Sequence, residues 1–275
     1  MTRNNPGKSK DALFMRILSA VVMIPAGLVV VSAGGIILVL ACVACGIGMW
    51  LEYQTVSSRT SRRELQFVGG VLITLNCLAS LLGISVGFMV AGLSSVLLGF
   101  YLCLNRTPKC GWLVAGFVVI NAALLSLLLL RNGVSGGLQL TLAIMVCVWS
   151  TDIFAYFAGR GFGGPKLAPQ GSPNKTWSGA AGAVICTVLI GALLAGLFGA
   201  SLLLWAPYAA LISMVAQLGD LIQSYWKRRF DVKDSSSLIP GHGGLLDRLD
   251  SFSAVLITTS ATSWLVVDFP QALLG

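Results

Sequence analysis

Charged side chains are scarce in this sequence of 275 residues: Asp, Glu, Lys and Arg together make up only 10%. Soluble globular domains are usually about one-quarter charged. Hydrophobic residues account for 56% of the positions, and a soluble core of this size cannot hide so much apolar surface. The scarcity of charge therefore excludes an ordinary soluble domain and indicates an integral membrane protein.

Histidine is scarcer still, because His242 is the single one in the chain. Cys42 and Cys45 form a Cys-x-x-Cys pair, but a zinc site needs further ligands and the histidine is far away in sequence. Of the seven cysteines, all but Cys110 lie inside apolar runs. We therefore expect free thiols packed between helices, with neither a zinc site nor a disulfide framework.

Long apolar runs are abundant, and nine of them are candidate membrane spans. A bilayer core of about 30 Å needs roughly 17–25 apolar residues per helix. The runs cover residues 16–31, 35–51, 67–84, 86–104, 112–130, 138–157, 179–198, 202–218 and 252–267. The sequence predicts an all-α, polytopic transmembrane bundle of about nine spans. We divide it into N-terminal spans (1–134) and C-terminal spans (135–275), the latter with two long loops at 159–178 and 219–251.

The basic residues test this count, because nine spans place the connections alternately on two sides of the membrane. Of the 18 Lys and Arg residues, 17 then fall on the side of the N-terminus and only Arg131 falls on the other. Basic loops stay cytoplasmic, so we expect a cytoplasmic N-terminus. This orientation also explains the net charge of +8 without a nucleic acid partner. The shorter connections at 52–66 and 105–111 look like basic anchors without chemistry.

Four acidic residues lie within or beside the spans, near one face: Asp152, Asp220, Asp247 and Asp250. A carboxylate at such a depth is costly and needs a partner. Structural ion pairing would explain any one of them, whereas four together favour a functional site. Helical spacing places Asp220, Ser224 and Lys227 on one stripe, and Asp247 shares a stripe with Asp250. Oxygen donors of this kind can hold Mg²⁺ together with substrate phosphates.

The two long loops add cations to these acids. Glycines at 241, 243 and 244 let backbone amides approach a phosphate, and the cations near them are Lys227, Arg228, Lys233 and Arg248. The other loop carries Arg160, Lys166 and Lys175, which also suit phosphate. For that loop alone, a basic anchor that binds lipid headgroups explains the sequence equally well.

One motif is more specific than these compositional signals. It reads Ser224-x-x-Lys227-Arg228-x4-Lys233-Asp234-x-Ser236-x2-Ile239-Pro240-x-His242-Gly243-Gly244-Leu245-x-Asp247-Arg248-Leu249-Asp250. Upstream are Asp152-x3-Tyr156-x2-Gly159-Arg160 and Ser172-Pro-Asn-Lys175-Thr176-Trp177. In this order, the three stretches resemble the phosphatidate cytidylyltransferase, or CDP-diacylglycerol synthase, family. The resemblance covers roughly the C-terminal half and departs from the family pattern at Phe154, Ser178, Gln223 and Trp226.

The resemblance implies a nucleotidyltransferase that makes CDP-diacylglycerol and pyrophosphate from phosphatidic acid and CTP, with Mg²⁺ and a second, monovalent cation. By matching position, it implies Asp220 and Asp247 as metal ligands. The implied catalytic set is Asp220, Ser224, Lys227, Asp247, Arg248 and Asp250. The implied substrate-binding set is Arg228, Lys233, Asp234, His242, Gly243, Gly244, Asp152, Arg160, Ser172, Asn174 and Lys175. Within it, we expect Ser172 and Asn174 to read the cytosine base.

The two substrates set the expected location of the site. CTP is cytosolic and phosphatidate lies in the membrane, so we expect a site at the cytoplasmic face of a bacterial inner membrane, in contact with membrane lipids. The resemblance also suggests a homodimer. Three alternatives remain: another membrane transferase that uses CTP or a lipid phosphate, a transporter, and a lipid-binding or assembly protein. A transporter would carry its acids near the midplane on broken helices, and a lipid-binding protein would leave the acids unexplained.

Overall fold

Helices make up nearly all of the regular structure in the computed structural model. The structure describes the backbone of residues 6–58, 62–265, 269 and 273, and their side chains except those of 6–14, 16 and 17. Nine helices occur in this part of the chain: α1 (Pro6–Ala33), α2 (Gly35–Ser58), α3 (Arg63–Ala79), α4 (Ile84–Leu104), α5 (Cys110–Asn132), α6 (Gly137–Phe162), α7 (Trp177–Phe198), α8 (Leu202–Arg229) and α9 (Leu246–Leu265). Each predicted span coincides with one of them, which confirms the all-α class. Residues 266 and 267 of the last predicted span lie outside the described residues.

Six helices are long and apolar enough to cross a membrane, counted over the described ranges: α2, α4, α5, α6, α7 and α8. The apolar part of α1 is shorter, at Leu18–Ala33. Helix α3 has 17 residues, and α9 begins with a charged turn. Many large apolar side chains point outward, and Leu203 is 84% exposed. This surface suits lipid rather than water, as expected for a polytopic membrane protein.

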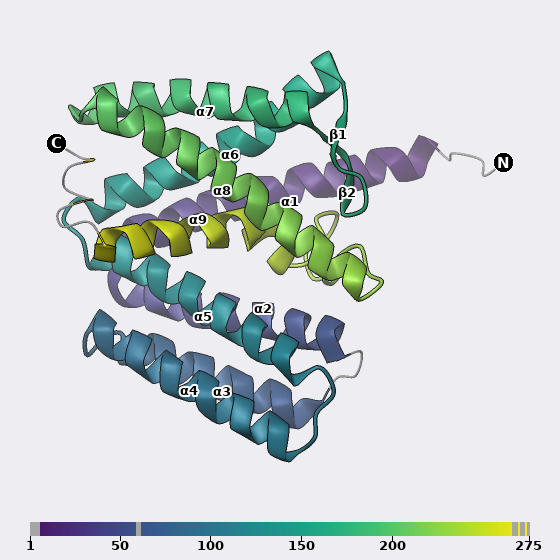
Figure 1. Cartoon of the computed structure of the whole chain (residues 1–275), viewed down its shortest axis with the longest axis vertical. Helices are drawn as coiled ribbons and strands as arrows, with labels where there is room; N and C mark the ends of the chain where they lie inside the picture. The colour runs from purple at the N-terminus through teal and green to yellow at the C-terminus, as the bar shows by residue number, and fades with distance from the viewer. Residues whose placement is uncertain (1–5, 59–61, 266–268, 270–272, 274–275) are drawn as a thin grey trace.

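The connections between helices alternate between the two ends of the bundle (Figure 1). The start of α1 shares one end with the end of α2 and with the α4–α5, α6–α7 and α8–α9 connections, and the end of α9 lies at the other. Most of the basic residues fall in or beside the connections of the first end. The predicted gathering of positive charge at one end of the bundle therefore agrees with the fold. Arg3 and Arg59 lie outside the described residues.

The α6–α7 connection contains a small antiparallel hairpin, formed by β1 (Lys166–Ala168) and β2 (Ser172–Thr176). Lys166 lies opposite Thr176, and Ala168 lies opposite Ser172. Thr176 is extended and caps α7, because its Oγ1 accepts a hydrogen bond from the Gly179 amide at 3.1 Å. This part of the long loop is thus a hairpin joined directly to the start of the next helix.

Two apolar clusters form the interior. The first is built mainly from α2, α3, α4 and α5, and the second mainly from α6, α8 and α9. In the first, the Asn76 amide donates to Asn121 Oδ1 at 2.8 Å and to Ser94 Oγ at 3.1 Å. These buried polar contacts join α3, α4 and α5. All seven cysteines are free, as predicted.

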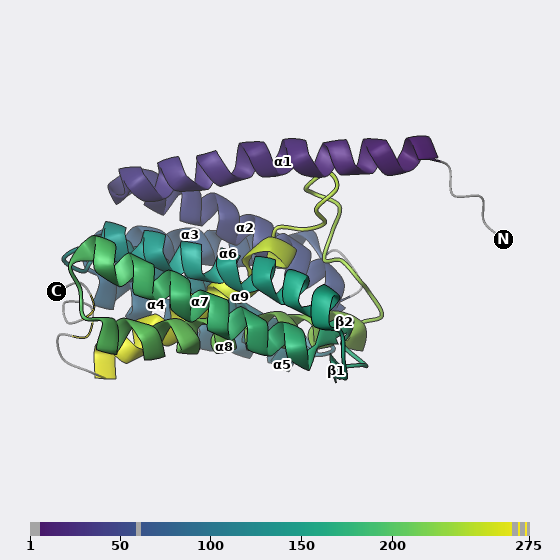
Figure 2. The ribbon, with the colours of Figure 1, turned by 90° about the horizontal axis from the view of Figure 1, so that it is seen from above.

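Helix α1 lies along one side of the bundle, outside the other helices (Figure 2). Gly34 and Gly35 connect it to α2 with φ angles of +62° and +51°, a conformation that favours glycine. Arg131 donates from Nε to the Val31 carbonyl at 2.6 Å and from its terminal nitrogen to the Ser32 carbonyl at 2.8 Å. The single basic residue predicted on the far side therefore caps the C-terminal end of α1.

Candidate active site

Asp220 lies in α8 at the end of the bundle that carries the basic connections. Its Oδ2 forms an ion pair with Lys175 Nζ of β2. One helical turn later, Ser224 Oγ donates to Asp220 Oδ1 at 3.2 Å. The side chains of Lys175 and Asp220 are 25% and 26% exposed, so the pair is open to a ligand. The hairpin and α8 thus bring together one residue from each of the two long loops.

Two more carboxylates, on other helices, lie near enough to Asp220 to interact with its charge. Asp152 of α6 and Asp250 of α9 both lie within electrostatic range of Asp220 and of each other. The positive charges of Arg248 and Lys175 attract Asp152, and that of Lys227 attracts Asp250. We call Asp152, Asp220 and Asp250 the acidic cluster. Three like charges from three helices repel one another, so this cluster favours a bound cation.

Asp247, at the start of α9, has a different set of partners. Its Oδ1 accepts a hydrogen bond from Lys227 Nζ at 2.7 Å. Its Oδ2 accepts hydrogen bonds from the Ser235 amide at 2.8 Å, from Ser235 Oγ at 3.0 Å and from the Gly244 amide at 3.0 Å. Burial raises the pKa of Asp247, but these bonds outweigh it and hold the pKa below its ordinary value. Asp247 therefore ties the connection between α8 and α9, residues 230–245, to α8; we call this connection the glycine loop.

The glycines of this loop are needed for its shape. Gly241 and Gly243 have φ angles of +77° and +82°, which side chains rarely adopt. A Cβ on Gly244 would lie 1.9 Å from Ser235 Oγ. The sequence predicted backbone amides free to meet a phosphate, and for Gly244 this is wrong, because Asp247 already accepts its N–H.

Glu52 supports the same loop from α2, and sequence reasoning missed it. Its Oε1 accepts hydrogen bonds from Ser236 Oγ at 2.6 Å and from the Leu245 amide at 2.8 Å. Its Oε2 accepts them from Ser235 Oγ and from the Leu246 amide, both at 2.9 Å. The residue is 6% exposed. The 52–66 segment, predicted as a basic anchor without chemistry, therefore begins with a residue that holds this loop in place. Its one signal was a carboxylate directly after an apolar run.

The remaining predicted residues make mostly local contacts. Arg160 donates to the Tyr156 hydroxyl at 2.7 Å, and Arg228 donates to the Val232 carbonyl at 3.0 Å. His242 Nδ1 lies 2.6 Å from Ser19 Oγ of α1, and the His242 carbonyl accepts from Arg248 Nε at 3.0 Å. Four other predicted residues lie on β2 or in the glycine loop and do not belong to the acidic cluster: Ser172, Asn174, Lys233 and Asp234.

Three of the positions that depart from the family pattern have structural partners. Gln223 donates to the Leu246 carbonyl at 2.7 Å, which links α8 to the start of α9. Trp226 is buried, stacks on Tyr53 with ring centroids 4.5 Å apart, and donates to Ser57 Oγ. Ser178 donates to the Gly163 carbonyl. These substitutions pack helices together and leave the carboxylates of the acidic cluster in place.

The acidic cluster provides the donors that Mg²⁺ prefers, which are carboxylate oxygens with room for waters and phosphate. Within the described residues, no three His, Cys, Asp or Glu side chains already converge as a metal cage. Asp220 fits the ion, because its partners are one cation and one hydroxyl. Asp247 fits less well, since Lys227 donates to its Oδ1 and the Ser235 and Gly244 amides donate to its Oδ2.

Comparison with known proteins gives consistent matches along most of the chain. A model described as "Cytidylyltransferase family" matches residues 14–266. A Brucella suis protein named phosphatidate cytidylyltransferase is 39% identical over 268 residues, covering 94% of this chain and 96% of its own. Proteins of the same name are 32% identical in Staphylococcus saprophyticus, over 88% of this chain and 95% of the relative, and 40% identical in Bacillus subtilis, over 54% and 56%.

Proposed function

The chain belongs to the cytidylyltransferase family, and from this premise we propose that it transfers the cytidylyl group of CTP to phosphatidic acid, forming CDP-diacylglycerol and pyrophosphate. The observation that carries the proposal is the acidic cluster beside Lys175, Lys227 and Arg248. Carboxylates with adjacent cations suit a metal-bound polyphosphate. A lipid-binding protein without catalytic activity would have no use for three crowded carboxylates.

The reaction needs little proton chemistry from the protein. A phosphate monoester such as phosphatidate is largely ionised near neutral pH, because its second pKa is about 6. One of its oxygens attacks the α-phosphorus of CTP. A new P–O bond forms as the bond from the α-phosphorus to the oxygen that bridges to the β-phosphate breaks. Pyrophosphate then leaves with that electron pair. The protein must align the two phosphates and neutralise their charge.

We assign these tasks to named residues. Asp220 would hold Mg²⁺, with Asp152 and Asp250 adding negative charge around it. When bound, this ion neutralises phosphate charge and polarises phosphoryl oxygens. Lys175 and Arg248 border the cluster and bind phosphate oxygens, while Lys227 and Asp247 fix the glycine loop. Asp247 as a second ligand, the monovalent cation, the homodimer and base reading by Ser172 and Asn174 stay predictions.

We also propose that the end with the basic connections faces the cytoplasm of a bacterial inner membrane. Ser237 and Ser135 are exposed serines at opposite ends of the bundle. In a background without the seven cysteines, Ser135→Cys should react with an impermeant maleimide in intact cells. Ser237→Cys should react only after permeabilisation. The reverse pattern would overturn the orientation and the access of CTP to the site.

The activity itself is tested with purified protein, phosphatidate, CTP and Mg²⁺. We expect an organic-soluble product with the mass of CDP-diacylglycerol and an equal amount of pyrophosphate. Chelation of the metal should abolish both. CTP hydrolysis without a cytidine-containing lipid would overturn the proposal.

A further inference from the structure

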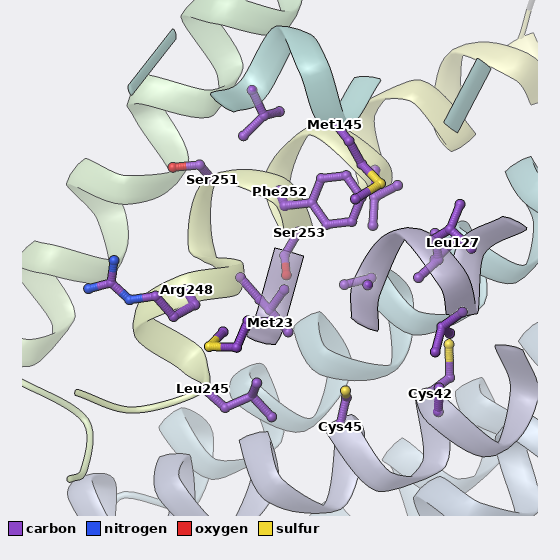
Figure 3. A pocket seen from close by; sticks show the side chains of 18 of the residues that line it. Met23, Cys42, Cys45, Leu127, Met145, Leu245, Arg248, Ser251, Phe252 and Ser253 are labelled. Carbon is purple, nitrogen blue, oxygen red and sulfur yellow. The ribbon is translucent and has the colours of Figure 1, made fainter. Parts of the chain in front are cut away.

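A large, mainly apolar cavity lies under α1, next to the acidic cluster. Its volume is about 400 Å³, within the range of ligand-binding pockets. Helices α1, α2, α5, α6 and α9 line it. Figure 3 shows Met23, Cys45, Leu245 and Phe252 around it. Its charged and polar lining includes Asp152, His242 and Arg248, the residues nearest the proposed chemistry. The cavity is therefore apolar along most of its walls and charged where it meets the glycine loop and the start of α9.

One face of α1 forms an entire wall of this cavity. The lining residues recur at helical spacing and are Ala20, Met23, Ile24, Gly27, Val30 and Val31. Val21, Val22 and Val29 on the other side of α1 are exposed, at 62%, 61% and 67%. A single helix thus separates the cavity from the lipid. The wall from 20 to 31 is roughly 16 Å long at about 1.5 Å per residue.

Helix α1 is fastened to the bundle at two places. Arg131 caps its end at Val31 and Ser32, next to the Gly34–Gly35 connection. Near its middle, Ser19 Oγ lies 2.6 Å from His242 Nδ1 and 3.3 Å from the Pro240 carbonyl oxygen. Because the His242 carbonyl accepts from Arg248 Nε, this second contact joins α1 to the ionic end of the cavity.

We propose that this cavity holds an acyl chain of the lipid substrate, with the lipid phosphate at the Arg248–His242 end and α1 as its cover. The inference rests on the proposed function, because it assigns the lipid of that reaction to a place. A wall of roughly 16 Å matches half of a bilayer core of about 30 Å, which is the depth of one leaflet. CTP cannot use such a cavity, because its phosphates and ribose need polar partners along their length. A lipid phosphate ester meets both requirements: charge at one end and an apolar chain over the rest.

Gly27 allows the cavity to be filled without disturbing the helix. A Cβ at Gly27 meets nothing within 4 Å, and the same holds for Gly92 of α4, which does not line the cavity. We expect Gly27→Phe to lower kcat/KM for dioleoyl phosphatidate by at least about tenfold, as for a blocked apolar subsite. The kcat/KM for dihexanoyl phosphatidate and the KM for CTP should stay unchanged. Gly92→Phe should behave like the wild type with both lipids.

The outcomes separate this inference from the proposed function. Equal loss with both lipids, or no loss with either, would overturn the acyl-chain site while leaving the activity intact. A wild-type protein that makes no CDP-diacylglycerol would instead overturn the proposed function.

A second measurement uses the wild-type protein, so it tests the site even if Gly27→Phe fails to fold. Phosphatidate with a photoreactive group at the methyl end of one chain should crosslink to peptides from residues 20–31 or 38–49. Crosslinks confined to other segments would overturn the site.

Discussion

Asp220→Asn should lower kcat by about a thousandfold while leaving the thermal unfolding of the purified protein unchanged. The amide keeps the volume but removes the charge that would hold Mg²⁺, and a loss of about 4 kcal/mol in transition-state stabilisation corresponds to about a thousandfold in rate. Stability should not suffer, because Asp152 and Asp250 act on Asp220 as like charges. Removing one of three crowded charges relieves repulsion and offsets the lost Lys175 pair. Added Mg²⁺ should not restore the rate.

The matched control is Asp231→Asn, in the exposed turn after α8. Asp231 has a φ of +57°, which Asn also tolerates, so only the charge changes. We expect near-wild-type turnover from this variant. Turnover above about one-tenth of the wild type in Asp220→Asn would exclude Asp220 as the principal ligand.

Glu52→Gln should lower both activity and stability, although Glu52 lies outside the acidic cluster. The carboxylate accepts four hydrogen bonds from the glycine loop and its flanks. An amide places an N–H₂ group against two of those donors, and a hydrogen bond to a charged group contributes about 1.5–3 kcal/mol. We expect the free energy of unfolding to fall by about 2–4 kcal/mol and kcat to fall at least tenfold. Thermal unfolding in detergent and turnover measure the two effects.

Glu64→Gln is the control, because Glu64 is exposed in the first turn of α3. It should match the wild type in both measurements. If Glu52→Gln unfolded at the wild-type temperature and had wild-type turnover, Glu52 would not be the residue that fixes the loop.

The helices and the position of the site could be predicted because both depend on local patterns. A run of apolar residues predicts a span wherever its partners lie, and the sharing of one stripe by Asp220 and Ser224 follows from helical spacing alone. The structure confirms these contacts, with Ser224 donating to Asp220. The gathering of basic residues at one end likewise follows from counting spans.

The role of Glu52 could not be predicted, because its partners are far away in sequence. Its contact with the Leu246 amide spans 194 positions, and half of its donors are backbone groups that carry no residue signature. The hydrogen bonds of Asp247 were also missed, although their donors lie only 3 to 20 positions away in sequence. A carboxylate beside glycines suggests a metal and phosphate site in sequence, whereas the folded loop turns the Gly244 amide onto Asp247. The hairpin was missed because Pro and Gly near 164–173 resemble an irregular turn.

CTP labelled at its α-phosphorus or at its γ-phosphorus tests the central claim most directly. The purified protein receives each substrate with phosphatidate and Mg²⁺, and the label is followed into the lipid and aqueous phases. The account predicts that the α-label enters the lipid, that the γ-label leaves as pyrophosphate, and that Asp220→Asn loses both transfers together. Appearance of the γ-label in the lipid, or an α-label that stays entirely in water, would contradict cytidylyl transfer at this site.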